Sequence, residues 1–302
     1  MMSNHPQLIT ALKVYKDIDL DREKNLQFFL NKHSTKEGTW GHLTVHEGNM
    51  QFVFLDGHGN EQSDYTLNPQ SPSLVIPPSS WHKIASVSDD FKATLQFYCH
   101  PHRYFEKKYH LPPIHHDLLY IYQTYLREQE KMTILDIGCG SGRNPLYFAL
   151  SGHQIIGIDK NEKAIENIKH IAKQEQLLNI EALLHDLNQP IPIQNKSFDF
   201  MCSTVTLQFL NPSSIQPLLA TLQSLTSVRG MHFLVFPIKA EPYIYPDSFT
   251  YLAESKELYH FYQDSGWSIL EYKENPGQLH KLDESGKPKQ GIFGLLLAQK
   301  HL

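Results

Sequence analysis

The stretch "TILDIGCGSGRN", residues 133–144, constrains the fold of this chain more than any other segment. A short apolar run typical of a buried strand leads directly into three glycines at alternate positions, Gly138, Gly140 and Gly142. Glycine lets the backbone approach a ligand closely, and a helix that begins after such a turn offers free N–H groups. The segment therefore predicts a strand, a turn and a helix that together form a ligand site.

After residue 131, segments typical of strands alternate with segments typical of helices. The strands "QIIGID", "IEALLHD", "FDFMCSTV" and "MHFLVFP" are separated by helices such as "NEKAIENIKHIAKQEQ". This alternation predicts a doubly wound, Rossmann-like α/β domain over residues 131–302. Ligands of such sheets bind at the carboxyl ends of the strands.

The residues before this domain have a different pattern. From Thr39 to Cys99, short apolar runs are bounded by Gly, Asn, Asp and Pro, which indicates an antiparallel barrel or sandwich. We therefore expect an all-β domain over residues 1–105. Pro112 and Pro113 interrupt the chain, and apolar residues then recur at helical spacing, so we expect a linker helix within residues 106–130.

Carboxylates follow three successive strands of the α/β domain. Asp136 lies in the first strand just before the glycine turn, where it can bind an ammonium group and would repel a phosphate. Asp159 ends the second strand and can accept hydrogen bonds from both hydroxyls of a ribose. Asp186 follows the third strand and can meet the amino group of an adenine, while Leu187 packs on the ring. A ligand with an ammonium, a ribose and an adenine but no phosphate is S-adenosylmethionine.

Two alternatives remain for these residues. Each aspartate on its own fits equally well as the cap of a helix or turn. The G-x-G-x-G spacing also resembles the G-x-G-x-x-G motif of dinucleotide enzymes. The three carboxylates together with the glycine turn favour S-adenosylmethionine over both.

Several motifs of this chain resemble those of a known family. The motifs "DIGCGSGRNPLYFALSGH", "DKN", "DLN", "STVTLQFL" and "GQLHKLDESGK" occur in the order found in tellurite-resistance methyltransferases of the TehB type. "HSTKEGTWGHLTV" resembles the N-terminal extension of the longer members. The resemblance implies a class I methyltransferase domain preceded by a cupin-like domain, acting on tellurite or selenium compounds. It adds further cofactor-binding residues, namely Arg143, Asn144, Lys160, Thr204 and Val205.

His280 and Lys281, in "GQLHKLD", are the candidate catalytic residues. We expect them in a loop between the last two strands, near the acceptor. A neutral imidazole can accept a proton from the acceptor, and a lysine can hold an oxyanion. The alternative is a solvated hairpin tip that carries both residues incidentally.

Composition favours a small-molecule acceptor. The net charge of −5 would repel a phosphate backbone, which argues against nucleic acid and anionic membrane surfaces as partners. No window approaches the roughly 20 apolar residues that span a bilayer. Three scattered cysteines do not form a disulfide framework, so we expect a cytoplasmic protein.

We expect no metal site among the histidines of the all-β domain. "IPPSSWHKI" looks like the second half of a cupin metal site, but the first half is missing. His42 and His46 would point to one face of a strand but lie about 13 Å apart. Two other functions remain open for the whole chain: a methyltransferase for thiols or other small metabolites, and a regulatory protein that binds the cofactor without catalysis.

Overall fold

The computed structural model describes residues 11–282 and 286–301. The chain divides into two compact units, residues 1–110 and 111–302. The segment expected to be one linker helix is divided between them: α2 (Tyr104–Tyr109) belongs to the first unit, and α3 (His116–Ile121) and the π-helix η3 (Tyr122–Leu126) belong to the second. The prolines at 112 and 113 lie between α2 and α3, where they prevent a continuous helix.

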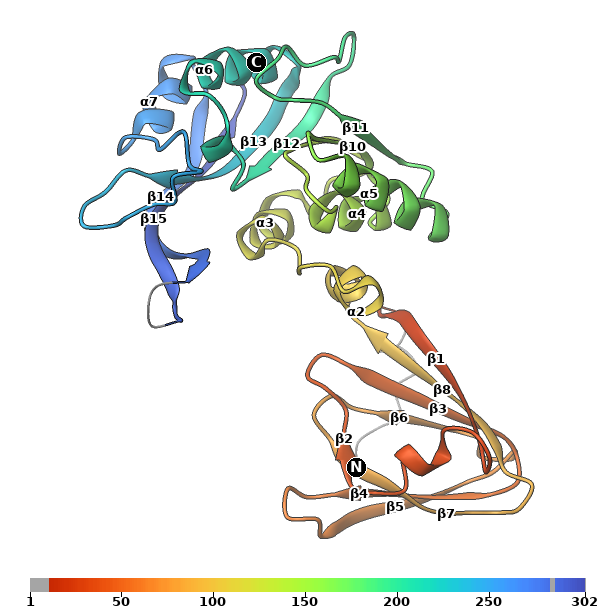
Figure 1. The fold of residues 1–302 in the computed structure, drawn as a ribbon. Helices are drawn as coiled ribbons and strands as arrows, with labels where there is room; N and C mark the ends of the chain where they lie inside the picture. Colours follow the sequence, from red (N-terminus) through yellow and green to blue (C-terminus); the bar gives the residue numbers. More distant parts are fainter. Residues whose placement is uncertain (1–10, 283–285, 302) are drawn as a thin grey trace. The chain divides into compact units, whose positions relative to one another are not determined.

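The first unit consists of two four-stranded antiparallel sheets (Figure 1). One has the order β1-β8-β3-β6 and the other β2-β7-β4-β5. The strands are β1 (Lys13–Asp21), β2 (His33–Ser34), β3 (Trp40–Glu47), β4 (Met50–Leu55), β5 (Glu61–Leu67), β6 (Ser73–Ile76), β7 (Trp81–Val87) and β8 (Lys92–Cys99). Short 3-10 helices occupy Leu26–Phe28 (η1) and Pro101–Arg103 (η2). Side chains of both sheets, such as Leu43 and Phe52, share one core, which confirms the all-β prediction.

The second unit contains a seven-stranded sheet with the order β11-β10-β9-β12-β13-β15-β14. Its strands are β9 (Thr133–Ile137), β10 (Gln154–Asp159), β11 (Ile180–Leu184), β12 (Phe198–Thr204), β13 (Thr226–Ile238), β14 (Ser268–Leu282) and β15 (Pro288–Gln299). Neighbours from β11 to β13 run parallel, and β15 is antiparallel to both β13 and β14. This is the doubly wound α/β architecture that the alternating segments predicted, and it agrees with the class I methyltransferase fold that the family resemblance implied.

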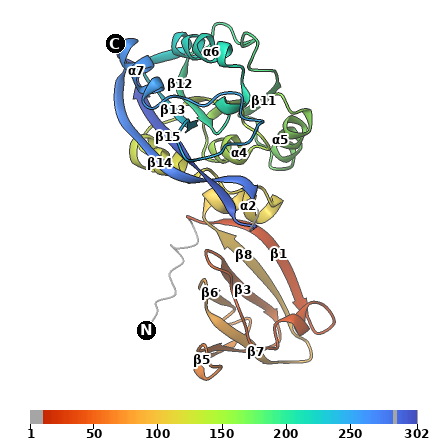
Figure 2. The ribbon, with the colours of Figure 1, turned by 60° about the vertical axis from the view of Figure 1, so that its left-hand side comes forward.

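Helices cover both faces of this sheet (Figure 2). They are α4 (Arg143–Leu150), α5 (Glu162–Gln174), η4 (Leu207–Phe209), α6 (Pro212–Ser224) and α7 (Glu257–Asp264). In the central strand β9, Ile134 packs in the core that contains residues of α3 and α4, and its neighbour Leu135 packs in the core that contains residues of α6 and α7. A strand buried on both faces is continuously apolar, which explains the sequence before the glycine turn.

The expected loop around His280 and Lys281 is wrong, because both residues belong to β14. Pro276 and Gly277 indicate a turn when the sequence is considered alone, yet they pair with residues of β15. β14 is the last strand of the sheet, and a proline is tolerated in an edge strand because its missing N–H can face away from the ladder. The side chains of His280 and Lys281 lie outside the described part of the structure.

Candidate active site

The glycine turn between β9 and α4 is packed at its base and open at its tip. A Cβ atom at Gly138 would come within 2.2 Å of the Thr206 side chain, so only glycine fits there. At Gly140 a Cβ atom would meet nothing within 4 Å. Gly142, with φ of 99°, caps α4 in the left-handed region that favours glycine. The turn therefore rests against the segment after β12 and leaves the backbone around Gly140 accessible to a ligand.

Asp159, at the end of β10, is fixed next to this turn. Its Oδ2 accepts a hydrogen bond from the backbone N–H of Gly140 at 2.9 Å, and its Oδ1 accepts one from Asn161 at 2.8 Å. Each carboxylate oxygen has two lone pairs, so each retains the capacity for a second bond. This geometry fits a carboxylate that receives the two hydroxyls of a ribose.

Asp136 is fully buried at the end of β9. Among the described residues, neither of its carboxylate oxygens has a hydrogen-bond partner. Burial raises the pKa of Asp136 to about 7, although the Cys202 thiol, the charge of Arg143 and the Asn144 side chain lower it. Cys202 and Asn144 are near the carboxylate but do not reach hydrogen-bond geometry. A buried carboxylate without a partner is costly, and an ammonium group would compensate it. The site thus fits the amino group of S-adenosylmethionine.

β12 ends beside the same turn. Thr204 is buried, and its Oγ1 accepts a hydrogen bond from Asn144 Nδ2 at 3.1 Å. Val205 has φ of 58°, a left-handed conformation that is a genuine outlier for a β-branched residue. Its N–H donates to the carbonyl of Val235 at 2.8 Å, and its carbonyl accepts from Gln208 Nε2 at 2.7 Å. The surrounding structure holds this strain, as it often does at functional sites.

The other predicted cofactor-binding residues lie after β10 and β11, farther along the edge of the sheet where the parallel strands end. Lys160 is exposed after β10. Asp186 is exposed after β11, and its Oδ1 accepts hydrogen bonds from the backbone N–H and the side-chain amide of Asn188, which lowers the pKa of Asp186. Leu187 is 5% exposed and packs in the core. The contacts of Asp186 are those of a local turn, so its role toward adenine stays a prediction.

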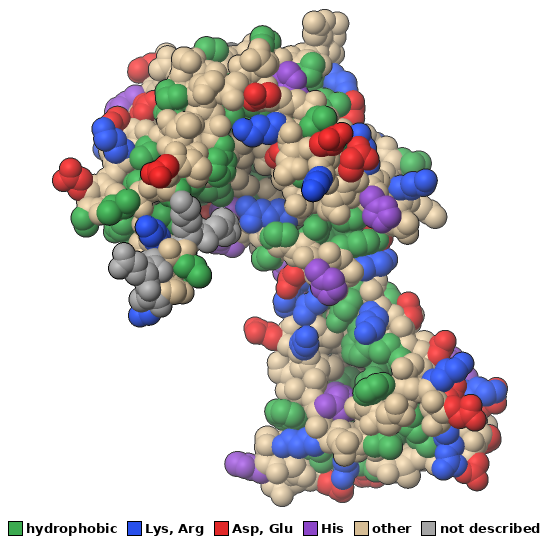
Figure 3. All heavy atoms as spheres, in the orientation of Figure 1, with side chains coloured by type: hydrophobic (Ala, Val, Ile, Leu, Met, Phe, Trp, Pro, Cys, Tyr) green, Lys and Arg blue, Asp and Glu red, His purple; other side chains and the backbone are tan. Residues whose placement is uncertain are grey.

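Figure 3 shows the surface of the second unit in the orientation of Figure 1. Its surface is hollowed between the β12–β13 region and α4, and both hydrophobic and positively charged side chains gather around the hollow.

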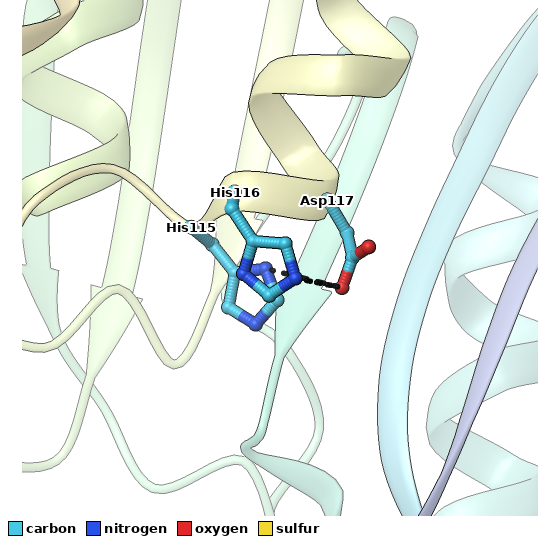
Figure 4. A group of neighbouring side chains, drawn as sticks. All are labelled: His115, His116 and Asp117. Atoms are coloured by element: carbon cyan, nitrogen blue, oxygen red, sulfur yellow. Dashed lines mark ion pairs between the residues drawn. The ribbon is translucent and has the colours of Figure 1, made fainter. Parts of the chain in front are cut away.

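The sequence analysis missed the segment before α3. The backbone N–H of His115 donates to Asn144 Oδ1 at 3.2 Å, so this segment returns to the first turn of α4. Figure 4 shows the side chains of His115, His116 and Asp117 gathered at the start of α3. His116 Nε2 lies 3.2 Å from Asp117 Oδ2, and His115 Nδ1 lies 3.9 Å from the same oxygen. No periodic signal in the sequence indicates a contact between residues 29 positions apart.

These three residues have the spacing of a metal site but a charge environment that opposes one. Their candidate ligand atoms lie within 4.8 Å of one another, and no other group of three such residues occurs in residues 11–282 and 286–301. The ammonium of Lys273, however, lies 3.6 Å from Asp117 Oδ1. The guanidinium of Arg143 is close enough to contribute to a lowered pKa at His115. The positive charges of Lys273 and Arg143 therefore disfavour the binding of a metal cation by these three residues.

Three histidines of the first unit, His33, His46 and His82, make side-chain hydrogen bonds, while the Nε2 atom of His33 is buried without a partner among the described residues. His33 and His82, whose ring centroids are 4.2 Å apart, each bond through Nδ1 to a backbone carbonyl two residues away. His46 bonds through Nε2 to Thr94 Oγ1 at 2.8 Å. Burial lowers the pKa of His82 to about 4, so this imidazole is neutral at pH 7.

Comparisons with known proteins agree with this geometry. The family model described as "Tellurite resistance protein TehB" matches residues 97–296, and the model of the TehB-like domain matches residues 22–95. The structure of TehB from Haemophilus influenzae superimposes with a TM-score of 0.87 at 35% identity, over 96% of this chain and 99% of that one. The YcgJ protein of Bacillus subtilis, at 15% identity and a TM-score of 0.50, shares the fold over 62% of this chain and 100% of its own.

Two proteins from Haemophilus influenzae strains, each named "Probable S-adenosyl-L-methionine-dependent methyltransferase TehB", are similar along almost their whole length. One is 36% identical over 92% of this chain and 94% of its own length, and the other is 35% identical over 95% and 97%. In the described residues, no helix is long and apolar enough to cross a membrane. The protein is an S-adenosylmethionine-dependent methyltransferase, and the chain belongs to the TehB family.

Proposed function

We propose that this methyltransferase transfers the methyl group to a small, soft acceptor, either tellurite or a selenium compound, in the cytoplasm. The observation that carries the proposal is the match to the tellurite-resistance family over residues 97–296, together with a likeness to TehB that extends through both units. The three cysteines are free and buried, which agrees with a reducing compartment.

The cofactor, when bound, supplies a methyl group on a positively charged sulfur that leaves as a neutral thioether. The chain itself must therefore align the reactants, exclude water and manage charge on the acceptor. Asp136 holds the ammonium of the cofactor and Asp159 holds its ribose, as the burial of Asp136 and the hydrogen bonds of Asp159 support. Thr204 and Val205 form the adjoining edge, where the carbonyl of Val205 is already engaged by Gln208.

On the acceptor side we assign His280 and Lys281. His280 accepts a proton from a protonated acceptor, and Lys281 holds a negatively charged one. Both belong to β14, whose hairpin with β15 forms one edge of the sheet.

The test is an acceptor screen with radiolabelled S-adenosylmethionine, comparing kcat/KM for tellurite, selenite and a neutral thiol. Asp159→Ala, which removes the ribose acceptor, is the matched negative control. We expect labelled product from tellurite or selenite in the wild-type protein and little in the variant. Efficient transfer to the thiol alone would replace this proposal with that of a small-metabolite methyltransferase.

A further inference from the structure

His115 lies against the cofactor turn although it precedes that turn by more than twenty residues. Its backbone N–H donates to Asn144 Oδ1, and Asn144 Nδ2 in turn donates to Thr204 Oγ1. The flanking residues Ile114 and Leu118 are buried in the core that contains residues of α4. These contacts fix residue 115 next to Asn144 at the start of α4, and Asn144 connects it to the end of β12.

The imidazole of His115 is buried and incompletely bonded. Its side chain is 12% exposed, and Nδ1 has no hydrogen-bond partner among the described residues. Burial, followed by the charge of Arg143, lowers the pKa of His115 to about 4, so the ring is neutral at pH 7. A neutral imidazole can donate from one nitrogen. A buried polar group without a partner needs an explanation, and a ligand supplies one.

Arg143 lies near both this imidazole and the carboxylate of Asp136. Its positive charge acts on the pKa of both Asp136 and His115, so a negative group, a positive group and a neutral donor lie near one another beside the turn. The methionine half of the cofactor carries an ammonium and a carboxylate on the same carbon. Asp136 complements the ammonium, which leaves the carboxylate to be matched by the other two residues.

We propose that His115, together with Arg143, binds the carboxylate of the methionine half of S-adenosylmethionine. His115 is thus a cofactor-positioning residue contributed by the segment before α3, outside the glycine motif. The nearby carboxylate of Asp117 does not oppose this assignment. Its Oδ2 lies 3.9 Å from His115 Nδ1 and 3.2 Å from His116 Nε2, and its Oδ1 lies 3.6 Å from Lys273 Nζ, so the ammonium of Lys273 offsets the negative charge beside the imidazole.

The experiment is calorimetric titration of the full-length protein with two ligands: S-adenosylmethionine and its decarboxylated analogue, which lacks only the carboxylate. His115→Ala should weaken binding of the complete cofactor about tenfold or more, since it removes a hydrogen bond to a charged group. It should change binding of the analogue by less than about twofold. His116→Ala is the matched control, because that side chain is 87% exposed, and it should leave both affinities unchanged.

Equal losses for the two ligands in His115→Ala would overturn the proposal and assign the residue a structural role. Unchanged affinity for the complete cofactor would overturn it as well. If the alanine variant does not fold, as judged by thermal unfolding, His115→Phe fills the buried space without a ring nitrogen and permits the same comparison. Because only cofactor binding is measured, the result is independent of which acceptor the enzyme methylates.

Discussion

Asp136→Asn tests the active site through the protonation of one buried group. The pKa of Asp136 rises from 3.8 to about 7 because its carboxylate is buried. A difference of roughly three pKa units corresponds to about 4 kcal/mol, which is the largest amount by which the ionised group can destabilise the folded protein. The amide of the variant has nearly the same shape and carries no charge.

The sign of the effect follows from proton linkage. The folded state binds this proton more tightly than the unfolded state, so the free energy of unfolding falls as the pH rises from about 4 to about 7. The free energy of unfolding of Asp136→Asn should not show this decrease, because the amide does not titrate. Without cofactor, the variant should therefore be more stable than the wild type at pH 7.5, by about 1 to 4 kcal/mol, and the difference should be smaller at pH 5.

Cofactor binding should favour the wild-type protein over Asp136→Asn. An ammonium beside Asp136 lowers its pKa, so binding releases a proton wherever the free protein holds one. The release should be about 0.9 protons at pH 6 and about half a proton at pH 7, and affinity should strengthen between these values. The variant should release none and should bind the cofactor more weakly than the wild type at pH 7, by about tenfold or more.

Two measurements check this prediction. Urea denaturation at pH 5 and pH 7.5 compares the free energy of unfolding of the two proteins. Calorimetry in two buffers with different ionisation enthalpies counts the protons released on binding. The reasoning fails if the variant is no more stable at pH 7.5 and the wild type binds the cofactor with the same affinity from pH 6 to pH 7.

Three other predictions concern the rest of the site. Asp159→Ala should weaken cofactor binding more than about tenfold, because two hydroxyls lose a charged acceptor worth roughly 1.5 to 3 kcal/mol; calorimetry on the folded variant checks it. His280→Ala should lower kcat by about 10² to 10⁴ and leave cofactor affinity within about twofold of the wild-type value. Lys281→Ala should mainly raise KM for an anionic acceptor. Steady-state rates that are unchanged in both variants would contradict the assignment. A fragment that begins at Leu111 should retain cofactor affinity, and one that begins at Arg127 should lose it because it lacks α3; titration of both decides.

The α/β fold was predictable because its signals are local and strong. A strand buried on both faces must be continuously apolar, and a turn that cannot accept a Cβ atom must contain glycine, as Gly138 does against Thr206. The positions of the carboxylates at the ends of β9 and β10 and after β11 were predictable for a related reason, since parallel neighbours end at one edge of the sheet. Their order in the sequence is also their order in space.

What the sequence did not indicate depends on contacts between distant segments. Pro276 and Gly277 have a strong local preference for a turn, but pairing with β15 extends β14 through them to Leu282. The return of His115 to Asn144 depends on how α3 packs on the sheet, which no local pattern specifies. The charge state of Asp136 likewise depends on the complete burial that the finished fold imposes.

The site shows why a stable sheet is needed around it. Val205 is held in a left-handed conformation, and Asp136 is kept without a hydrogen-bond partner in the described structure. Either feature alone would favour local rearrangement, but both lie at the ends of central strands whose neighbours are paired on each side. The sheet therefore prevents the site from relaxing. A ligand that places an ammonium group beside Asp136 compensates the cost of burying this carboxylate, and that compensation favours binding. Substitutions that remove the left-handed conformation at Val205 or the buried charge at Asp136 should stabilise the protein and lower its affinity for the cofactor.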